Sequence, residues 1–450
     1  MTKRGCLLVV LVCLVGGAAV WADSAAGGEG AWPAPAKVSG PLTLAKAVET
    51  ALANSPSLAA ARQRARGASF SMLEAVGEKV PSLSATLAAT TGTMSSTLTS
   101  PMEVTPSTVF NMGREGSLMA QLMLMYPLST GGRLERSIDA AALSALAADQ
   151  DVETASLDVA LETKLAYRQA LRTAAYVEVY QEYVADSEER LRADQAKYDV
   201  GKLPLQYLLR DKAELANAKQ MLANARRDAA MALSDLKTAM AVSLDSEVQL
   251  TDELSHQPIV TTLESLLAAA EANRPEIAAA KVRVEAAKAS TRAAVSAYRP
   301  QVNAVLMAGG MSTDGMREAG YAAGIVVGIP LVDVPRLARR DTAAAGEAEM
   351  GEQLRQVHLQ VANEVNKAWL ALTAAEASVA AAQEVVASAE EDYRVAKLRY
   401  EAGKSVNVEV IDAQAALLRA RANYTDALYE FNAALDQLER AVGGKIPEQA

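Results

Sequence analysis

Residues 197–202 read KYDVGK, and residues 399–404 read RYEAGK. A second pair of segments, LANSP at 52–56 and AEANRP at 270–275, precedes them at matching places in the chain. The offset is 219 positions between the two prolines (56 and 275) and 202 between the two glycines (201 and 403). Self-similarity over so long a distance indicates a duplicated half-molecule rather than a solenoid of short repeats. The chain is therefore predicted to contain one structural unit twice.

The first unit, residues 41–241, is predicted to run helix, strand, strand, very long helix, helix. Thr43 caps a helix that continues to about Gly77 with a break at Pro56. Alternation of apolar and polar residues then predicts strands at 81–91 and 117–127. The next two helices are expected at 133–198, where Gly and Pro are absent, and at 205–240. At 1.5 Å per residue the longer one extends for about 100 Å.

The second unit, residues 263–443, follows a linker at 242–262 and repeats the order. A helix is expected at 263–297, and strands at 300–310 and 320–330. Two further helices are expected at 336–400 and 408–441, before a short tail at 444–450. The helices are Ala-dense and heptad-like, which allows backbones to approach closely as they do in coiled coils.

The N-terminus has the pattern of a secretory signal. Lys3 and Arg4 precede an apolar stretch, and small residues up to Ala22 form an exit site, so residues 1–22 are predicted to be removed. Residues 23–40 read as a flexible leader rich in Gly and Pro. Both cysteines lie in the signal, which excludes disulfides and cysteine-ligated metals from the mature chain.

Composition excludes several classes of function. Without Lys3 and Arg4, the 54 acidic residues outnumber about 42 basic ones, for a net charge of about −12. No basic stripe with interleaved aromatics is present, so nucleic acid is not an expected partner. No later stretch of about 20 uninterrupted apolar residues predicts a membrane-spanning helix. No nucleophile elbow, zinc-binding HExxH or phosphate loop occurs, so neither enzymatic activity nor a cofactor or metal is expected.

The four strands carry the functional argument. Each has about ten residues, the length that spans a bilayer when tilted. Strands in lipid must close into a barrel, and four are too few, because the smallest barrels have about eight. The chain is thus expected to pool its strands with other copies of itself in an outer membrane. The alternative is a soluble sheet packed on helices, which such long, polar-faced helices would cover poorly.

The duplicated order and the tip sequences resemble the TolC family of outer membrane efflux and secretion channels. The most specific segment is YEAGKSVNVEVIDAQ at 400–414. A second, YPLSTGGR at 126–133, is similar to the family's strand-to-helix junction, whose residues here are Pro127, Gly131 and Gly132. Its counterpart, IPLVDVPR at 329–336, keeps Pro330 but lacks the double glycine.

The resemblance implies a mixed α+β membrane protein. Three copies, a homotrimer, would form a β-barrel of twelve strands, four from each chain. Their helices would continue as a coiled-coil barrel, a tunnel through the periplasm of a Gram-negative cell. The implied function is an outer membrane exit duct of a tripartite efflux or type I secretion system, with a periplasmic adaptor (membrane fusion) protein and an inner-membrane transporter as partners.

The resemblance also implies a gate at the periplasmic end. Tyr400, Glu409 and Asp412 match the family's gate positions, whereas Ser405 stands at the family's arginine and Tyr207 at its first-copy acid. A gate here would then rest on packing and hydrogen bonds instead of that salt bridge. The acids could form carboxylate rings that attract cations, or could simply stabilise a helix N-terminus.

The two tips are expected to form left-handed turns and, by resemblance, to contact the adaptor. Their residues are Gly201, Lys202, Leu203, Gly403, Lys404 and Ser405. Methionines at 119, 123 and 125, with others at 94, 102 and 112, suggest either a route for soft metal ions or, with more weight, lipid-facing or loop residues. Two questions stay open on the sequence: whether drugs, metals or proteins pass, and whether the chain is instead a periplasmic coiled-coil structural protein without a pore.

Overall fold

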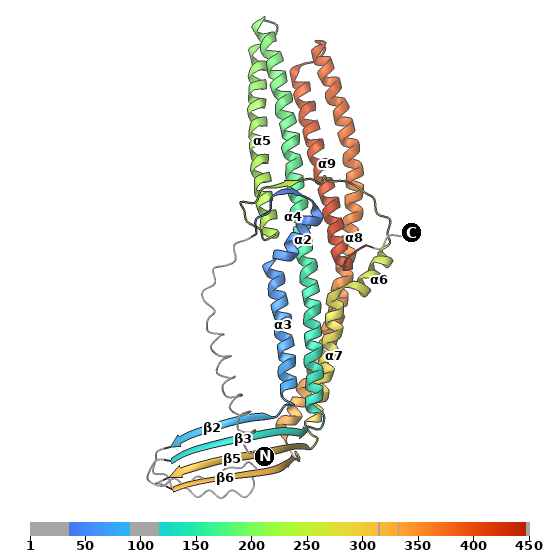
Figure 1. The fold of residues 1–450 in the computed structure, drawn as a ribbon. Coiled ribbons are helices and arrows are strands. Elements are labelled where there is room, and N and C mark those ends of the chain that lie inside the picture. The colour runs from blue at the N-terminus through green and yellow to red at the C-terminus, as the bar shows by residue number, and fades with distance from the viewer. Residues whose placement is uncertain (1–35, 91–116, 314–315, 332, 447–450) are drawn as a thin grey trace.

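A computed structural model describes residues 36–90, 117–313, 316–331 and 333–446. A long helical body carries a four-stranded sheet at one end and two helical hairpin tips at the other (Figure 1). The predicted signal (1–22), most of the leader and Met94, Met102 and Met112 lie outside the described residues.

The helices and strands of the two halves follow one order with nearly equal lengths. The first half contains α2 (Leu44–Asn54), α3 (Pro56–Gly77), β2 (Ser82–Thr90), β3 (Ser117–Ser129), α4 (Arg133–Asp199) and α5 (Leu205–Ala239). The second contains α6 (Leu263–Asn273), α7 (Pro275–Ser296), β5 (Gln301–Thr313), β6 (Met316–Gly328), α8 (Val334–Glu401) and α9 (Asn407–Val442). The long helices α4 and α8 have 67 and 68 residues, so each extends for about 100 Å.

Prolines divide the shorter helical segments. Ser55 ends α2 and accepts a hydrogen bond from the Leu58 amide at 3.4 Å, while Pro56 begins α3. The helix expected at 263–297 is likewise divided, because Arg274 interrupts it and Pro275 begins α7. A proline lacks an amide donor and disfavours helical geometry in the residue before it, so both halves break at the equivalent place.

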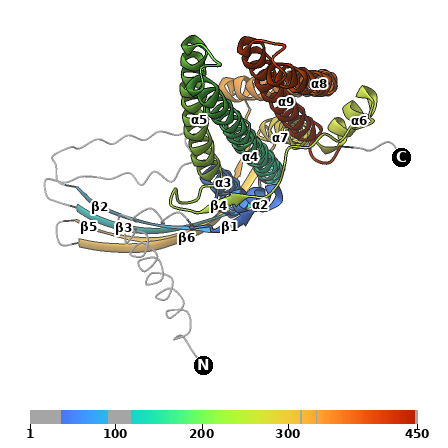
Figure 2. The same cartoon turned by 90° about the horizontal axis from the view of Figure 1, so that it is seen from above.

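Each half has its own hydrophobic core. In the first, Leu58 of α3, Tyr167 of α4 and Leu236 of α5 pack together. In the second, Val365 of α8 and Phe431 of α9 lie at the centre of the corresponding cluster. Seen from above, the α4–α5 hairpin stands beside the α8–α9 hairpin (Figure 2). The helical body is thus two similar halves set side by side.

Helix α8 differs from one sequence-based expectation. By length and composition it could cross a membrane, although no membrane-spanning helix was expected. The physical reason is its alanine content, which raises hydropathy without adding bulk. Val361, Val365, Leu372 and Val379 place one face of α8 in the core of the second half. Most of the rest of its apolar stretch, including Leu370, is exposed in the single chain.

The main sheet has the order β2-β3-β5-β6 and is antiparallel throughout. The β3–β5 pairing joins the two halves, and β2 and β6 form the edges. The strands predicted at 300–310 and 320–330 lie instead at Gln301–Thr313 and Met316–Gly328. Gly309 and Gly310 look like loop residues but sit inside β5, where a Cβ on Gly309 would come within 2.9 Å of the Ala120 carbonyl oxygen. Close approach of the strands explains these glycines.

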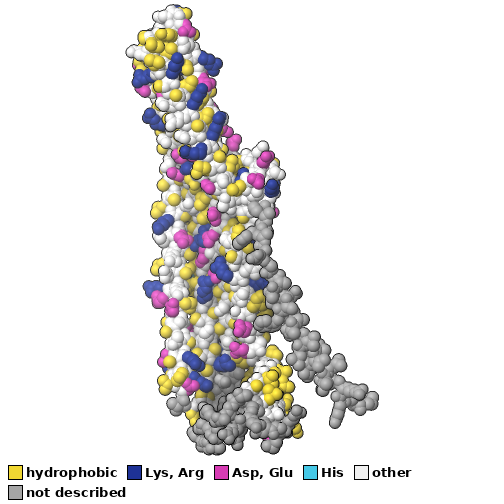
Figure 3. All heavy atoms as spheres, turned by 90° about the vertical axis from the view of Figure 1, so that its left-hand side faces the viewer, with side chains coloured by type: hydrophobic (Ala, Val, Ile, Leu, Met, Phe, Trp, Pro, Cys, Tyr) yellow, Lys and Arg dark blue, Asp and Glu magenta, His cyan; other side chains and the backbone are white. Residues whose placement is uncertain are grey.

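The two faces of the sheet differ in chemistry. One face exposes large apolar side chains, namely Leu83, Leu87, Leu118, Leu122, Leu306, Tyr321 and Ile325. The register places Ser82, Ser84, Thr86, Gln121 and Glu318 on the opposite face, which also carries Met119 and Met123. These two methionines therefore share a face of the sheet with polar residues. Charged side chains of both signs are scattered over the helical body, whereas an apolar patch marks the sheet end (Figure 3).

A small parallel sheet, which the sequence did not predict, ties the leader to the linker. Its strands are β1 (Gly40–Leu42) and β4 (Val248–Leu250), and Ala36 bridges Val242 just before them. The buried Tyr167 hydroxyl donates to the Leu42 carbonyl at 2.8 Å and to Asp252 at 2.9 Å. Strands of three residues are too short to show a pattern in the sequence.

Candidate functional site at the helix tips

Both tips turn on a glycine with positive φ, +74° at Gly201 and +67° at Gly403. The amide of each glycine donates to the carbonyl of the tyrosine three residues before it, Tyr198 or Tyr400, at 2.8 and 3.0 Å. The lysine after each glycine donates back to the carbonyl five residues earlier at 2.8 Å. These bonds satisfy the last carbonyls of α4 and α8, as the predicted left-handed turns require.

Below the turns, Tyr400 of α8 meets Asp194 of α4. The Tyr400 hydroxyl lies 2.7 Å from Oδ1 and 2.6 Å from Oδ2 of Asp194, whose side chain is fully buried. Lys197 completes the group, with its Nζ 2.9 Å from Asp194 Oδ1 and 4.0 Å from the centre of the Tyr400 ring. A charge-assisted pair and a cation–π contact thus converge on one buried carboxylate.

A second buried carboxylate, Asp211 of α5, extends the network to the other two helices. Asp211 Oδ1 accepts from Arg190 Nε at 3.2 Å and from Asn407 Nδ2 at 2.9 Å. Arg190 also donates to the side-chain carbonyl of Gln414. Because Asn407 and Gln414 belong to α9, the network connects α4, α5, α8 and α9. All four helices of the tips therefore depend on one set of buried polar contacts.

Burial shapes the electrostatics of this network. Desolvation raises the pKa of Asp211, the Asn407 hydrogen bond lowers it, and the neighbouring Asp194 raises it further. Burial and the bond to Asp194 also raise the pKa of Tyr400, so its hydroxyl remains a neutral donor at physiological pH. Asp211 consequently protonates more readily than an ordinary aspartate.

Several buried polar atoms at the tips find no hydrogen-bond partner within the described part of the chain. They are Arg190 Nη2, Asp211 Oδ2, Asn407 Oδ1 and Gln414 Nε2. Beside them, Asp186, Glu189, Tyr393 and Lys397 help to line a polar cavity of about 70 Å³. Folded proteins leave few such atoms unpaired, and this cavity is polar and large enough for water to bond to them.

The structure separates the three predicted gate residues. Tyr400 belongs to the buried network, whereas Glu409 and Asp412 are exposed on the first turns of α9. Glu409 accepts a hydrogen bond from Ser405 Oγ at 2.5 Å. Among the remaining tip residues, Gly201, Lys202, Gly403 and Lys404 are exposed, and Leu203 and Ser405 are half-buried.

Sequence reasoning missed Asp194 and Asp211, although the repeat contains a signal that identifies them. At the offset of 202 positions, they correspond to Ala396 and Ala413. Those alanines pack with Val410 in a small apolar cluster of the second half. A charged residue that replaces a core alanine in only one copy marks a place where the copies differ in role.

At the opposite end of the body, the strand-to-helix junction holds the two halves together. Gly131 and Gly132 have φ of +65° and +90°, and Arg299 Nη1 donates to the Gly131 carbonyl at 3.2 Å. Pro127 lies in β3 opposite Asn303, next to a register shift. Proline cannot donate to the ladder, which accounts for the irregularity there. Pro330 follows the end of β6.

Comparisons with known proteins agree with this geometry. The family model described as outer membrane efflux protein matches residues 47–242 and 266–444. The outer membrane efflux protein BepC of Brucella suis biovar 1 is 27% identical over 296 residues, which cover 61% of this chain and 63% of BepC, somewhat less than two thirds of its length. The probable efflux pump outer membrane protein SepC of Pseudomonas putida is 25% identical over 337 residues, or 72% of this chain and 68% of SepC.

Solved structures show the same fold. The outer membrane protein VceC of Vibrio cholerae matches with a TM-score of 0.72 and 21% identity, over 89% of this chain and 96% of VceC. The CmeC outer membrane channel of Campylobacter jejuni matches with a TM-score of 0.73 and 18% identity, over 89% of this chain and 85% of CmeC. Both proteins are similar to this chain in the arrangement of helices and strands.

Proposed function

Because the chain belongs to the outer membrane efflux protein family, we propose that it is the outer membrane exit duct of a tripartite efflux system. It conducts substrates passively, and an inner-membrane transporter supplies the energy. BepC and SepC are named as components of efflux, which supports efflux over type I secretion for this chain. The tips lie at the far end of the body from the sheet (Figure 1), so in an outer membrane duct they extend into the periplasm.

The open sheet is the observation that carries this proposal. Its apolar face suits lipid and its opposite face suits a wet lumen, while β2 and β6 present unpaired edges. Unpaired strand edges are not tolerated in lipid, so the sheet must close with strands from other copies. Three chains give twelve strands, and the long helices of the three would then surround a tunnel.

The native mass in detergent tests the proposal. Protein extracted from outer membranes should behave as a particle of three chains, and it should form conducting pores in planar bilayers. A water-soluble monomer or dimer that is recovered without detergent would overturn the duct, and a periplasmic coiled-coil structural protein without a pore would replace it.

The buried network supports a gate at the periplasmic end. Tyr400 holds α8 to α4 through Asp194, at a buried polar network that connects all four helices of the tips. Glu409 and Asp412 project from the start of α9, where three copies would place six carboxylates around the narrowest point. Opening then requires the Tyr400–Asp194 contact to break, and the carboxylates favour cations over anions.

The turns themselves are the proposed contact with a periplasmic adaptor protein. Leu203 and Ser405 are half-buried at the two tips, next to exposed Lys202 and Lys404. Replacing Leu203 or Ser405 with Trp should prevent assembly with the adaptor while the yield of trimer stays unchanged. Normal assembly of both variants would remove the tips from that interface.

A further inference from the structure

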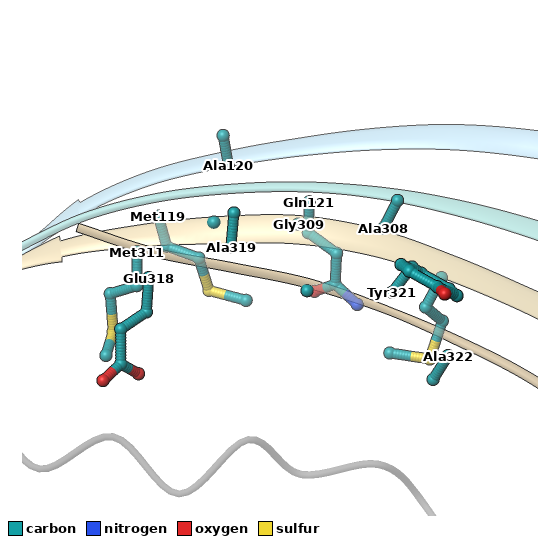
Figure 4. A pocket seen from close by; sticks show the side chains of 13 residues that line it. Met119, Ala120, Gln121, Ala308, Gly309, Met311, Glu318, Ala319, Tyr321 and Ala322 are labelled. Carbon is teal, nitrogen blue, oxygen red and sulfur yellow. The ribbon is translucent and has the colours of Figure 1, made fainter.

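The polar face of the sheet is hollowed by a depression of about 420 Å³. In the register, Met119 pairs with Met311, and Met311 pairs with Glu318. The side chains of Met119, Met311, Glu318 and Gln121 all project from the same side of the sheet, opposite to Ala120 (Figure 4). These residues form one end and one wall of the depression.

Glycines create the space. Two positions along β5 from Met311, Gly309 pairs with Gly320 of β6, and both lack a side chain to fill the gap. Two positions further, Met307 closes the other end of the depression. The floor is thus backbone, and thioethers stand at both ends. A volume of this size falls within the range of small-molecule sites in proteins.

The lining sets the chemistry of the occupant. Methionine side chains are flexible and polarisable, so they adapt to varied apolar shapes and contact aromatic rings favourably. Glu318 is the one acidic or basic side chain among the residues that line the depression. An apolar, adaptable cradle with a single carboxylate at its rim is complementary to a molecule that combines a planar apolar body with a positive charge.

A soft metal ion fits this arrangement less well. Met307 and Met311 are four residues apart on one strand, which separates them by roughly 14 Å along β5. They cannot share one ion, which leaves Met119 and Met311, paired across β3 and β5, as the two thioethers of the depression that can meet. The carboxylate of Glu318 beside this pair is a hard ligand that a soft ion disfavours. An organic molecule can span the same distance.

We infer that this depression, which we call the methionine cradle (Met119, Gln121, Met307, Met311, Glu318 and the Gly309–Gly320 floor), binds amphipathic organic cations on their way through the barrel. The inference rests on the proposed function, because that function makes the polar face the lumen. Three copies would place three cradles around the lumen, each a weak site from which a substrate readily leaves.

Gly320 offers a direct test, and Gly324 provides a matched control. A Cβ added at either glycine meets nothing within 4 Å, so a leucine fits the backbone at both positions. The two glycines lie on one strand and face one side, but only Gly320 lines the cradle. Gly320→Leu should therefore fill the cradle, whereas Gly324→Leu should leave it open.

The experiment measures binding of ethidium, a planar organic cation, to the full chain purified in detergent, by fluorescence anisotropy. We expect Gly320→Leu to weaken binding about tenfold and Glu318→Gln about threefold, with Gly324→Leu unchanged. Equal binding by the wild type and Gly320→Leu would overturn the cradle, since it would show partition into detergent only. Binding of silver ion that Met311→Leu abolishes, without ethidium binding, would assign the site to a soft metal instead.

The native mass of the same samples separates the two levels of inference. A conducting trimer that binds ethidium independently of Gly320 and Glu318 contradicts the cradle and leaves the duct intact. A chain that neither forms trimers nor conducts contradicts the duct itself, whatever it binds.

Discussion

The phenol of Tyr400 donates to the carboxylate of Asp194 across 206 positions of sequence, with its oxygen within 2.7 Å of both carboxylate oxygens. The bond joins α8 of the second half to α4 of the first, immediately below both turns. Lys197, stacked on the Tyr400 ring, holds the same carboxylate from its own helix. The tip of each hairpin is therefore fixed by the other half of the molecule.

Replacing this tyrosine should loosen the tips. Tyr400→Phe keeps the ring but removes a donor to a buried carboxylate, which costs about 1–3 kcal/mol of local stability. We expect single-channel conductance in planar bilayers to rise. The control is Tyr393→Phe, about two helical turns earlier on α8. The Tyr393 hydroxyl lies 3.4 Å from Asp186 Oδ2, so it makes at best a weak hydrogen bond. Identical conductance of Tyr400→Phe and the wild type would exclude this contact from the gate.

The pKa of Asp211 gives the tips a pH dependence of definite sign. Burial raises it above the ordinary aspartate value near 3.9. A raised pKa in the folded state means that folding favours the protonated form. The associated stability is present below the ordinary pKa and is lost as the pH rises through the folded-state pKa. Acidification from about pH 7 toward pH 4 should therefore tighten the tips.

Amide hydrogen exchange at residues 190–214, corrected for the intrinsic rate, measures this effect. Protection should increase on acidification in the wild type and vary much less in Asp211→Asn, which cannot titrate. Arg190 and Asp194 remain in both proteins, so they do not account for the difference between the two. Protection that falls on acidification in the wild type would show that the ion pair with Arg190 outweighs the cost of burial.

Most helices and strands could be predicted from the sequence because the patterns that indicate them extend over many residues. A stretch without glycine or proline predicts α4 to within a few residues, and the repeat of the same order predicts α8 in spite of Gly346 and Gly351. The repeated turn at Gly201 and Gly403 sets the ends of both helices.

The errors occur at element ends. The strand predicted at 300–310 continues to Thr313, because Gly309 and Gly310, which usually end a strand, stand inside β5 where neighbouring strands approach too closely for a side chain. Composition alone does not report such contacts.

Only part of the candidate site could be predicted from the sequence, because burial of its other residues depends on how the helices pack. Tyr400 was identified because it stands in a recognisable turn sequence, whereas Asp194 and Asp211 sit in ordinary helical surroundings. Charged residues on helices are usually solvated, and their burial depends on which helices pack there. Only the comparison with Ala396 and Ala413 of the other copy distinguishes these two acids before the structure is known.

The exposed acids of α9 make a separate prediction about conduction. Replacing Glu409 and Asp412 together with alanine should raise conductance and remove block by divalent cations, because a ring of carboxylates would be lost. Glu352→Ala serves as the control, because Glu352 is an exposed acid in the part of α8 that is far from the tip. If conductance and block stay unchanged while the helix loses a few tenths of a kcal/mol, the two acids only stabilise the start of α9.

A pair of glycines tests how the sheet is attached to the body. Gly131 and Gly201 have nearly the same positive φ, +65° and +74°, so alanine at either position costs about 1–2 kcal/mol of backbone strain. Their surroundings differ, because a Cβ at Gly131 would lie 2.4 Å from Cβ of Arg299, whereas a Cβ at Gly201 meets nothing within 4 Å.

Gly131→Ala should therefore lower the thermal unfolding temperature clearly more than Gly201→Ala does. The additional loss arises because Arg299 must move away and give up its bond to the Gly131 carbonyl. Equal losses would mean that the junction relaxes freely around the added methyl group. A larger loss at Gly131 would show that the first residues after β3 and the last residues before β5 are locked together. The β3–β5 pairing that joins the two halves would then be fixed at its base as well as along its length.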